Sequence, residues 1–188
     1  MKKVLSNYLK QYKELYSNTL FYKQDNFENI EEKNKIFVSG DLNADIVFIN
    51  DDFKSSPFIG ESGKLFEKIL SAVGLNMGSV CIFSFSNFSI NEKEDFSFNE
   101  IDDFHKYFKN KLKSINPKLI VALGLCPVVN FIGEAVNSID GYRNKIHKYH
   151  GIDLLMTYNP SKLLVNAEFK RPVWDDFKLI RKNYLDGK

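Results

Sequence analysis

Polar side chains that could do chemistry stand at or just beyond the ends of three apolar runs of the chain: Asp51 and Asp52, Ser84 and Asn87, and Asn159. A carboxylate can stabilise a developing positive charge or orient a water molecule. Amides and hydroxyls donate and accept hydrogen bonds and so can read the polar edge of a ligand. We therefore look for a functional site among these side chains, provided that the fold brings the three runs together.

The elements that would position them follow from the hydrophobic pattern. Strands are predicted at residues 45–50, 79–85, 118–124 and 152–158, and helices at residues 4–20, 61–73, 97–115, 127–136 and 171–184. Continuous apolar strands separated by helices indicate a parallel sheet that is covered on both faces. We predict an α/β fold of three layers, α/β/α, with a central, mainly parallel four-stranded sheet. Ligands of such sheets bind beyond the carboxyl ends of the strands.

The length of 188 residues suits one domain. We expect residues 1–35 to form a helix and a connection packed on a domain of residues 36–188. The net charge is only +2, but residues 142–188 hold ten Lys or Arg against five Asp or Glu. A basic C-terminal quarter could meet a polyanion such as DNA. A solvated surface of mixed charge is the alternative.

The two cysteines, Cys81 and Cys126, stand in apolar runs and are interpreted as small core residues. Their number and setting indicate neither a disulfide framework nor a metal site, and we expect no cofactor. The sequence shows no cleavable signal peptide and no apolar run of membrane-spanning length. We therefore expect a cytoplasmic monomer that does not bind membranes.

Four blocks of the sequence carry a resemblance to a known family: residues 57–66 (PFIGESGKLF), 116–124 (NPKLIVALG), 157–164 (TYNPSKLL) and 170–177 (KRPVWDDF). In this order and spacing they resemble the motifs of family 4 uracil-DNA glycosylases, over roughly residues 36–182. The resemblance implies the α/β fold of that superfamily. It also implies DNA, single- or double-stranded, as the partner, and a part in base excision repair.

Enzymes of this kind extrude the damaged nucleotide into a pocket and break its glycosidic bond through a cation-like sugar. The resemblance implies that Asp51 is the carboxylate that stabilises this charge, with Asp52 as the neighbouring alternative. It implies that Phe58 stacks on the flipped base. Asn159 takes the place of a family His that hydrogen-bonds the base, although Asn-Pro is also a turn signal by itself.

Other residues are implied as contacts of the DNA: Gly60, Ser62, Gly63, Arg143, Lys162, Leu163 and Leu164. The first three stand at a helix start, where free backbone amides suit a phosphate, and capping by Ser62 is the simpler alternative. The two leucines would press into the duplex where the base has left, although a core role is expected for one of them. His147, in the same basic stretch as Arg143, is a further candidate nucleophile.

The sequence departs from the family pattern in several places. The loop between Asp51 and Pro57 is shortened. Ser84 stands where the family has an Asn that reads the uracil edge, and Asn87 lies three residues on. The four cluster-binding cysteines of the family are absent, with Phe104 at one such position. We therefore expect no iron–sulfur cluster.

Three hypotheses remain open from the sequence. The first is a DNA glycosylase that acts on uracil or a related damaged base. The second is a catalytically impaired DNA-binding protein of the same fold, which acts as a scaffold or damage reader. The third is a small-molecule hydrolase or nucleotide-binding protein unrelated to DNA, and the absence of P-loop and GxGxxG motifs disfavours it.

Overall fold

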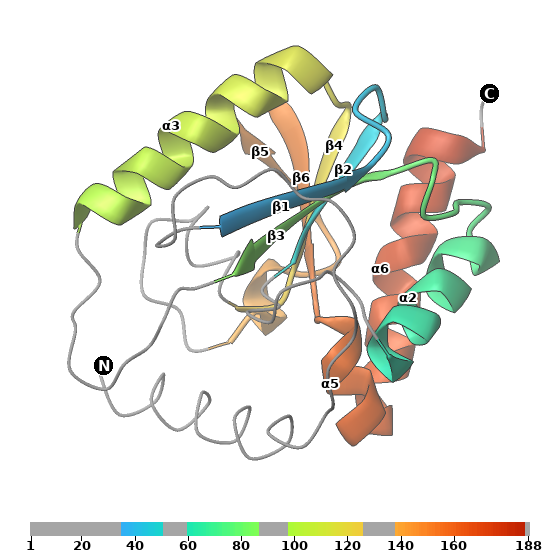
Figure 1. Cartoon of the computed structure of the whole chain (residues 1–188). Coiled ribbons are helices and arrows are strands. Elements are labelled where there is room, and N and C mark those ends of the chain that lie inside the picture. Colours follow the sequence, from blue (N-terminus) through green and yellow to red (C-terminus); the bar gives the residue numbers. More distant parts are fainter. Residues whose placement is uncertain (1–34, 51–59, 87–97, 126–137, 187–188) are drawn as a thin grey trace. The chain divides into compact units, whose positions relative to one another are not determined.

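The structure is a computed structural model that describes residues 35–50, 60–86, 98–125 and 138–186 (Figure 1). The chain divides into two compact units, Met1–Glu32 and Lys33–Lys188, and all described residues belong to the second. The helices expected at residues 4–20 and 127–136 lie outside the described residues, and so do Asp51, Asp52, Phe58 and Asn87.

The described residues form a six-stranded sheet of order β1-β3-β2-β4-β6-β5. Its strands are β1 (Lys35–Gly40), β2 (Ile46–Asn50), β3 (Cys81–Ser86), β4 (Leu119–Leu123), β5 (Ile146–Tyr149) and β6 (Ile152–Thr157). The four central strands, β3, β2, β4 and β6, run parallel, and the edge strands β1 and β5 pair antiparallel with their neighbours.

The predicted α/β class is confirmed, but the predicted count of four strands is wrong. The four strands predicted from the sequence are the central parallel ones. In two of them, β2 and β4, every residue is buried. The two missed strands lie at the edges. β5, for example, has three partly or fully exposed residues and one buried residue, Tyr149. A half-exposed edge strand has no continuous apolar run, and so the pattern used for the central strands does not detect it.

The main helices are α2 (Glu61–Ala72), α3 (Phe98–Ile115), α5 (Pro160–Val165) and α6 (Lys170–Ile180), which continues into the π-helical segment η3 (Arg181–Leu185). Short 3-10 turns form at η1 (Asp140–Tyr142) and η2 (Ala167–Phe169). Helices α2, α3 and α6 lie where the sequence predicted helices. None of the helices in the described ranges is both long and apolar enough to cross a membrane.

Three aromatic contacts define the layers on either side of the sheet. Phe48 of β2 packs against Phe66 of α2 and Phe177 of α6, with ring centres 5.1 and 6.1 Å apart. Phe83 of β3 packs against Phe108 of α3 at 5.2 Å. Phe83 is in register with the neighbour of Phe48 in β2, so the two rings point to opposite faces. The sheet therefore has α2 and α6 on one face and α3 on the other (Figure 1).

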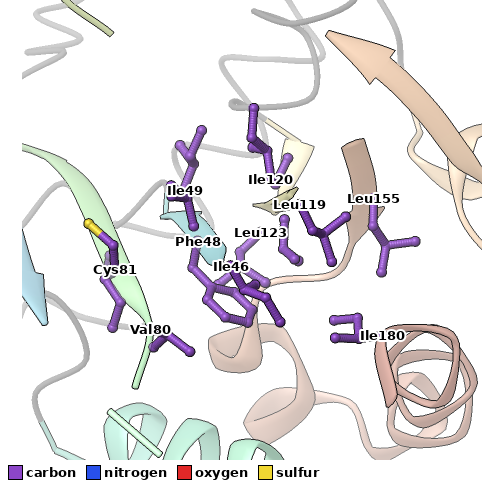
Figure 2. Close-up of a cluster of buried hydrophobic side chains, with 14 of the residues drawn as sticks. Ile46, Phe48, Ile49, Val80, Cys81, Leu119, Ile120, Leu123, Leu155 and Ile180 are labelled. Atoms are coloured by element: carbon purple, nitrogen blue, oxygen red, sulfur yellow. The ribbon is translucent and has the colours of Figure 1, made fainter. Parts of the chain in front are cut away.

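The core on the α2 and α6 side is filled by long apolar side chains from the central strands. Figure 2 shows Ile46 and Phe48 directed toward the helices, where Ile180 of α6 meets them, while Ile49 and Ile120 point to the other face. All five side chains are at most 2% exposed. This packing holds the carboxyl ends of the four parallel strands, and the polar residues that follow them, in fixed positions.

Candidate active site

Three polar residues lie at the same level of the sheet, at the carboxyl ends of the parallel strands. Asn50 of β2 is in register with Ser84 of β3 on one side and with Leu123 of β4 on the other, and Leu123 is in register with Thr157 of β6. In-register residues of parallel strands share a face, so Asn50, Ser84 and Thr157 all point toward the layer of α2 and α6. Each of the three is at most 1% exposed.

Asn159 joins this row from the connection that follows β6. Its Nδ2 donates a hydrogen bond to Oδ1 of Asn50 at 2.7 Å. Its own Oδ1 accepts hydrogen bonds from the backbone N–H and the hydroxyl of Ser161, at 2.9 and 2.8 Å. Asn159 is 5% exposed. The structure therefore brings the predicted site residue Asn159 next to Asn50, a residue to which the sequence assigned no role.

The same contacts mark the start of a helix that the hydrophobic pattern did not predict. Asn159 is the N-cap of helix α5, and Pro160 occupies the first helical position. Asn as N-cap followed by Pro at the first position is a recognised start of a helix, and this signal could have been detected in the sequence. The simpler reading of Asn159 as a turn former and its place at the site are thus both compatible with the structure.

Two buried polar atoms of this row have no hydrogen-bond partner within the described part of the chain: Nδ2 of Asn50 and Oγ of Ser84. An unpaired buried donor costs roughly 1–3 kcal/mol, so such atoms are uncommon unless a ligand or water completes them. The two atoms come from neighbouring strands, which in a sheet lie ~4.8 Å apart. One small polar ligand at this edge of the sheet could therefore pair with both.

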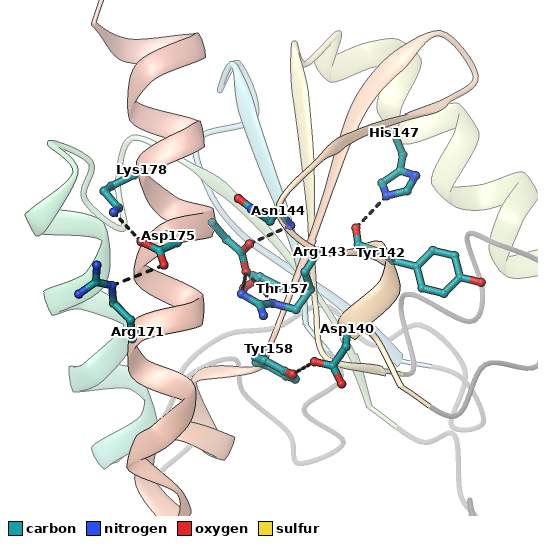
Figure 3. A network of polar contacts seen from close by, with 11 residues as sticks. Asp140, Tyr142, Arg143, Asn144, His147, Thr157, Tyr158, Arg171, Asp175 and Lys178 are labelled. Carbon is teal, nitrogen blue, oxygen red and sulfur yellow. Dashed lines mark hydrogen bonds and ion pairs between the residues drawn. The ribbon is translucent and has the colours of Figure 1, made fainter.

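The buried carboxylate of Asp176 binds residues from two segments near this row of polar side chains. Oδ2 of Asp176 in α6 accepts hydrogen bonds from Nε and Nη2 of Arg143, at 2.9 and 2.6 Å, and from the hydroxyl of Thr157 at 2.5 Å. Its Oδ1 accepts one from the backbone N–H of Asn144 at 3.0 Å. Figure 3 shows Arg143, Asn144 and Thr157 gathered beside α6. Burial raises the pKa of Asp176, and the bonds from Thr157 and Arg143 act against that rise.

Asn144 takes a left-handed backbone conformation, with φ 57°. Asn adopts this conformation more readily than most residues other than Gly. Its backbone N–H is then available to Asp176, as described above.

A second polar cluster surrounds the Tyr158 ring. The guanidinium of Arg143 and the ammonium of Lys162 each lie 4.5 Å from the ring centre. The Tyr158 hydroxyl donates a hydrogen bond to Asp140 (Figure 3). Lys162 is also 4.2 Å from the ring of Phe169, and burial lowers the pKa of its amine. Burial and the bond to Asp140 raise the pKa of Tyr158 to about 12.

The start of α2 differs in detail from the expectation. Gly60, with φ 75°, is the N-cap, and no side chain caps the helix there. Ser62 and Gly63 lie inside the first turn and are buried, so Ser62 does not occupy the N-cap position. A side chain at Gly60 would meet no atom of the described residues within 4 Å. Its φ, rather than close packing, therefore favours Gly at this position.

Comparison with known proteins identifies the family of the chain. The model of the uracil DNA glycosylase superfamily matches residues 37–178. The chain belongs to the uracil-DNA glycosylase superfamily. A relative named type-4 uracil-DNA glycosylase from Archaeoglobus fulgidus is 25% identical over 154 residues, which cover 75% of this chain and 77% of the relative. One of the same name from Sulfurisphaera tokodaii is 29% identical over 153 residues, 74% and 70% of the two chains.

The predicted DNA-contacting residues of this superfamily member have different surroundings. Arg143 has 11% of its side chain exposed and is bound to Asp176. Leu163 is 2% exposed and belongs to the core, the role expected for one of the two leucines. Leu164 is 47% exposed and is followed by Val165 at 59%, which the sequence had not singled out. The exposed apolar pair at the end of α5 is therefore Leu164 and Val165.

His147, the further candidate nucleophile, is half-buried on the edge strand β5. Its Nε2 lies 2.8 Å from the backbone carbonyl of Tyr142. Because a carbonyl oxygen only accepts, Nε2 carries the proton in this contact and is not the nucleophilic nitrogen of the ring. Among the described residues, no three His, Cys, Asp or Glu side chains lie close enough to hold a metal ion.

Proposed function

We propose that the protein is a DNA glycosylase that hydrolyses the N-glycosidic bond of uracil, or of a related damaged base, flipped out of DNA. The observation that carries this proposal is the pair of unpaired buried polar atoms on Asn50 and Ser84. They lie at the carboxyl ends of adjacent parallel strands, where ligands of such sheets bind. Membership of the superfamily and the names of the two relatives support a base of DNA as the ligand.

The proposed chemistry divides between binding and charge stabilisation. A flipped base would enter at the edge formed by Asn50 and Ser84, with Phe58 stacked on its face and Asn87 near its edge. Cleavage leaves positive charge on the sugar, and Asp51, one residue beyond Asn50, would supply the negative charge that stabilises it. Asn159 would complete the site through its bond to Asn50.

DNA would be held mainly by the basic C-terminal quarter of the chain, by the start of α2 at residues 60–63, and by the exposed apolar end of α5. Lys162 and Leu164 are the candidates on α5, because Leu163 is buried. The charge of Arg143 is paired with Asp176. Arg143 would therefore support DNA binding mainly by holding η1 and Tyr158 in place, and less by contacting a phosphate itself. We expect a monomer to suffice.

A second candidate function is a DNA-binding scaffold of the same fold without catalysis. The observation that favours it is the role of Asn159, whose amide replaces the family His and is turned toward Asn50. An amide can donate a hydrogen bond but cannot carry the positive charge of an imidazolium. Under this function the base pocket would recognise a flipped base without cleaving its glycosidic bond.

The two functions are separated by a strand-cleavage assay on oligonucleotides that carry one uracil, in single- and double-stranded form, with alkali treatment of the abasic product. A gel-shift measurement on the same oligonucleotides runs in parallel. Uracil-dependent cleavage supports the glycosylase. Binding without cleavage in either strand context overturns it in favour of the scaffold, and the absence of both overturns both functions.

A further inference from the structure

The orientation of the Asn50 amide is fixed by a relay that begins at a backbone N–H. The N–H of Ser161 can only donate, so the Asn159 atom 2.9 Å from it must be the acceptor Oδ1. The amide nitrogen of Asn159 then faces Asn50, and the Asn50 atom 2.7 Å from it must be Oδ1. Nδ2 of Asn50 is therefore the amide atom that does not face Asn159, and it can only donate.

We propose that Asn50 is the residue that determines base specificity, and that Asn159 is a positioning residue that keeps the Asn50 amide turned with its N–H groups toward the base. This inference rests on the proposed function, because it names the part of the base that the same site would read. The site would select a base edge with a carbonyl oxygen beside a ring N–H, as in uracil. It would reject the edge of cytosine, which has an amino group in place of that carbonyl.

The chemistry of the two unpaired atoms supports this selection. Nδ2 of Asn50 would donate to the carbonyl oxygen of the base, and the Ser84 hydroxyl would accept from the ring N–H. Ser84 by itself discriminates poorly, because a hydroxyl can donate as readily as accept. The oriented amide cannot reverse its role without breaking the bond to Asn159. An amino group opposite Nδ2 would leave two buried donors facing each other, which we expect to weaken binding on the order of 10–100-fold.

The relay also explains how this chain could read a base with Ser at position 84, where the family pattern has Asn. The register pairs Asn50 with Ser84 across β2 and β3, so an amide on the neighbouring strand lies at the same level of the sheet. Asn50 is fully buried, and its amide is bound on one side only within the described part of the chain. The donor is thus supplied from β2 instead of β3.

The decisive variant is Asn159→Asp. Its carboxylate still accepts from the Ser161 N–H but has no N–H to give to Asn50. The Asn50 amide should therefore turn to donate to Asp, which places Oδ1 outward as an acceptor. We expect the preference for uracil over cytosine to fall by on the order of 10-fold or more. The matched control is Ser161→Ala, which removes the hydroxyl but keeps the backbone N–H and should leave the preference unchanged.

Two readouts keep this inference separate from the proposed function. The first is the ratio of cleavage rates on oligonucleotides that carry one uracil or one cytosine. The second needs no catalysis: the side-chain NH₂ signals of Asn50 are followed by ¹⁵N NMR of the whole protein during titration with free uracil and, separately, free cytosine. We expect uracil to shift these signals and cytosine to shift them much less.

The outcomes are distinct. Selective shifts of the Asn50 signals without uracil cleavage support the inference and overturn the glycosylase function. Uracil cleavage combined with unmoved Asn50 signals overturns the inference and leaves the function intact. An unchanged base preference in folded Asn159→Asp protein also overturns the inference. If that variant does not fold, the titration of the wild-type protein still decides, because equal shifts with both bases contradict it.

Discussion

Arg143 directs two nitrogens, Nε and Nη2, at one oxygen of the fully buried Asp176, at 2.9 and 2.6 Å. Thr157 at the end of β6 donates to the same oxygen. This carboxylate therefore connects the η1 turn, the carboxyl end of β6 and helix α6. Thr157 and Asp176 belong to two of the four sequence blocks that resemble family motifs, so part of the polar content of these two blocks binds within the protein.

Arg143→Ala should destabilise the protein by about 3–5 kcal/mol, because removing one partner of a buried pair leaves the other charge uncompensated. The free energy of unfolding, measured in urea, checks this. Arg171→Ala is the matched control. Arg171 pairs with Asp175 on the outer side of the same helix, at 3.5 Å, with 81% of its side chain exposed (Figure 3). A change within about 0.5 kcal/mol is expected there, and equal losses in both variants would contradict the assignment.

The adjacent leucines of α5 should separate stability from DNA binding. Leu163→Ala removes a core side chain and should lower the free energy of unfolding by roughly 2–5 kcal/mol. Leu164→Ala removes an exposed side chain and should change stability by less than about 0.5 kcal/mol, while weakening affinity for uracil-containing duplex DNA. Unfolding and gel-shift measurements on both variants check this. Unchanged DNA affinity in Leu164→Ala would exclude Leu164 as the wedge.

The pH dependence of stability should include a contribution from Asp140. Hydrogen bonds from Ser138 and Tyr158 hold the pKa of Asp140 below its ordinary value. A carboxyl group with a lowered pKa in the folded state stabilises the protein above its unfolded pKa of about 4, and this stabilisation is lost as the pH falls through the folded pKa. The difference in unfolding free energy between wild type and Asp140→Asn should therefore be present at neutral pH and shrink in acid. A difference that is constant with pH would contradict this.

Asp51→Asn should separate the two proposed functions. The change keeps size and hydrogen bonding but removes the charge that would stabilise the cationic sugar. In an active glycosylase, we expect single-turnover cleavage of uracil-containing DNA to slow by roughly 10²–10³-fold. DNA affinity should stay equal or rise slightly, because one negative charge facing phosphates is lost.

Asp52→Asn is the matched control for that experiment, since consecutive residues that leave a strand point to opposite sides. It should slow cleavage much less. If Asp52→Asn is instead the damaging change, the shortened loop has shifted the register by one residue. If neither change alters a measurable activity, the carboxylate mechanism is wrong.

The sequence by itself determined the layered α/β class and the four central strands, because a buried strand must be apolar along its whole length and that pattern is local. It also placed Ser84 and Asn159 at the carboxyl-end side of the sheet, next to Asn50. The hydrophobic pattern did not predict the edge strands β1 and β5 or the short helix α5. β5 is half exposed, and the Asn159-Pro160 signal was interpreted as a turn rather than as the start of a helix.

Only the tertiary structure decided which polar side chains meet. Asn50 and Asn159 are 109 positions apart, and Arg143 and Asp176 are 33 apart. Each pair depends on the order β3-β2-β4-β6 and on its register, which the connecting helices produce and no local pattern encodes. The same arrangement binds Arg143 to a buried carboxylate and leaves the N–H groups of Asn50 unpaired among the described residues. The chemical type of each side chain is known from the sequence. Whether its charge or hydrogen-bonding groups are already paired depends on its neighbours in the folded protein.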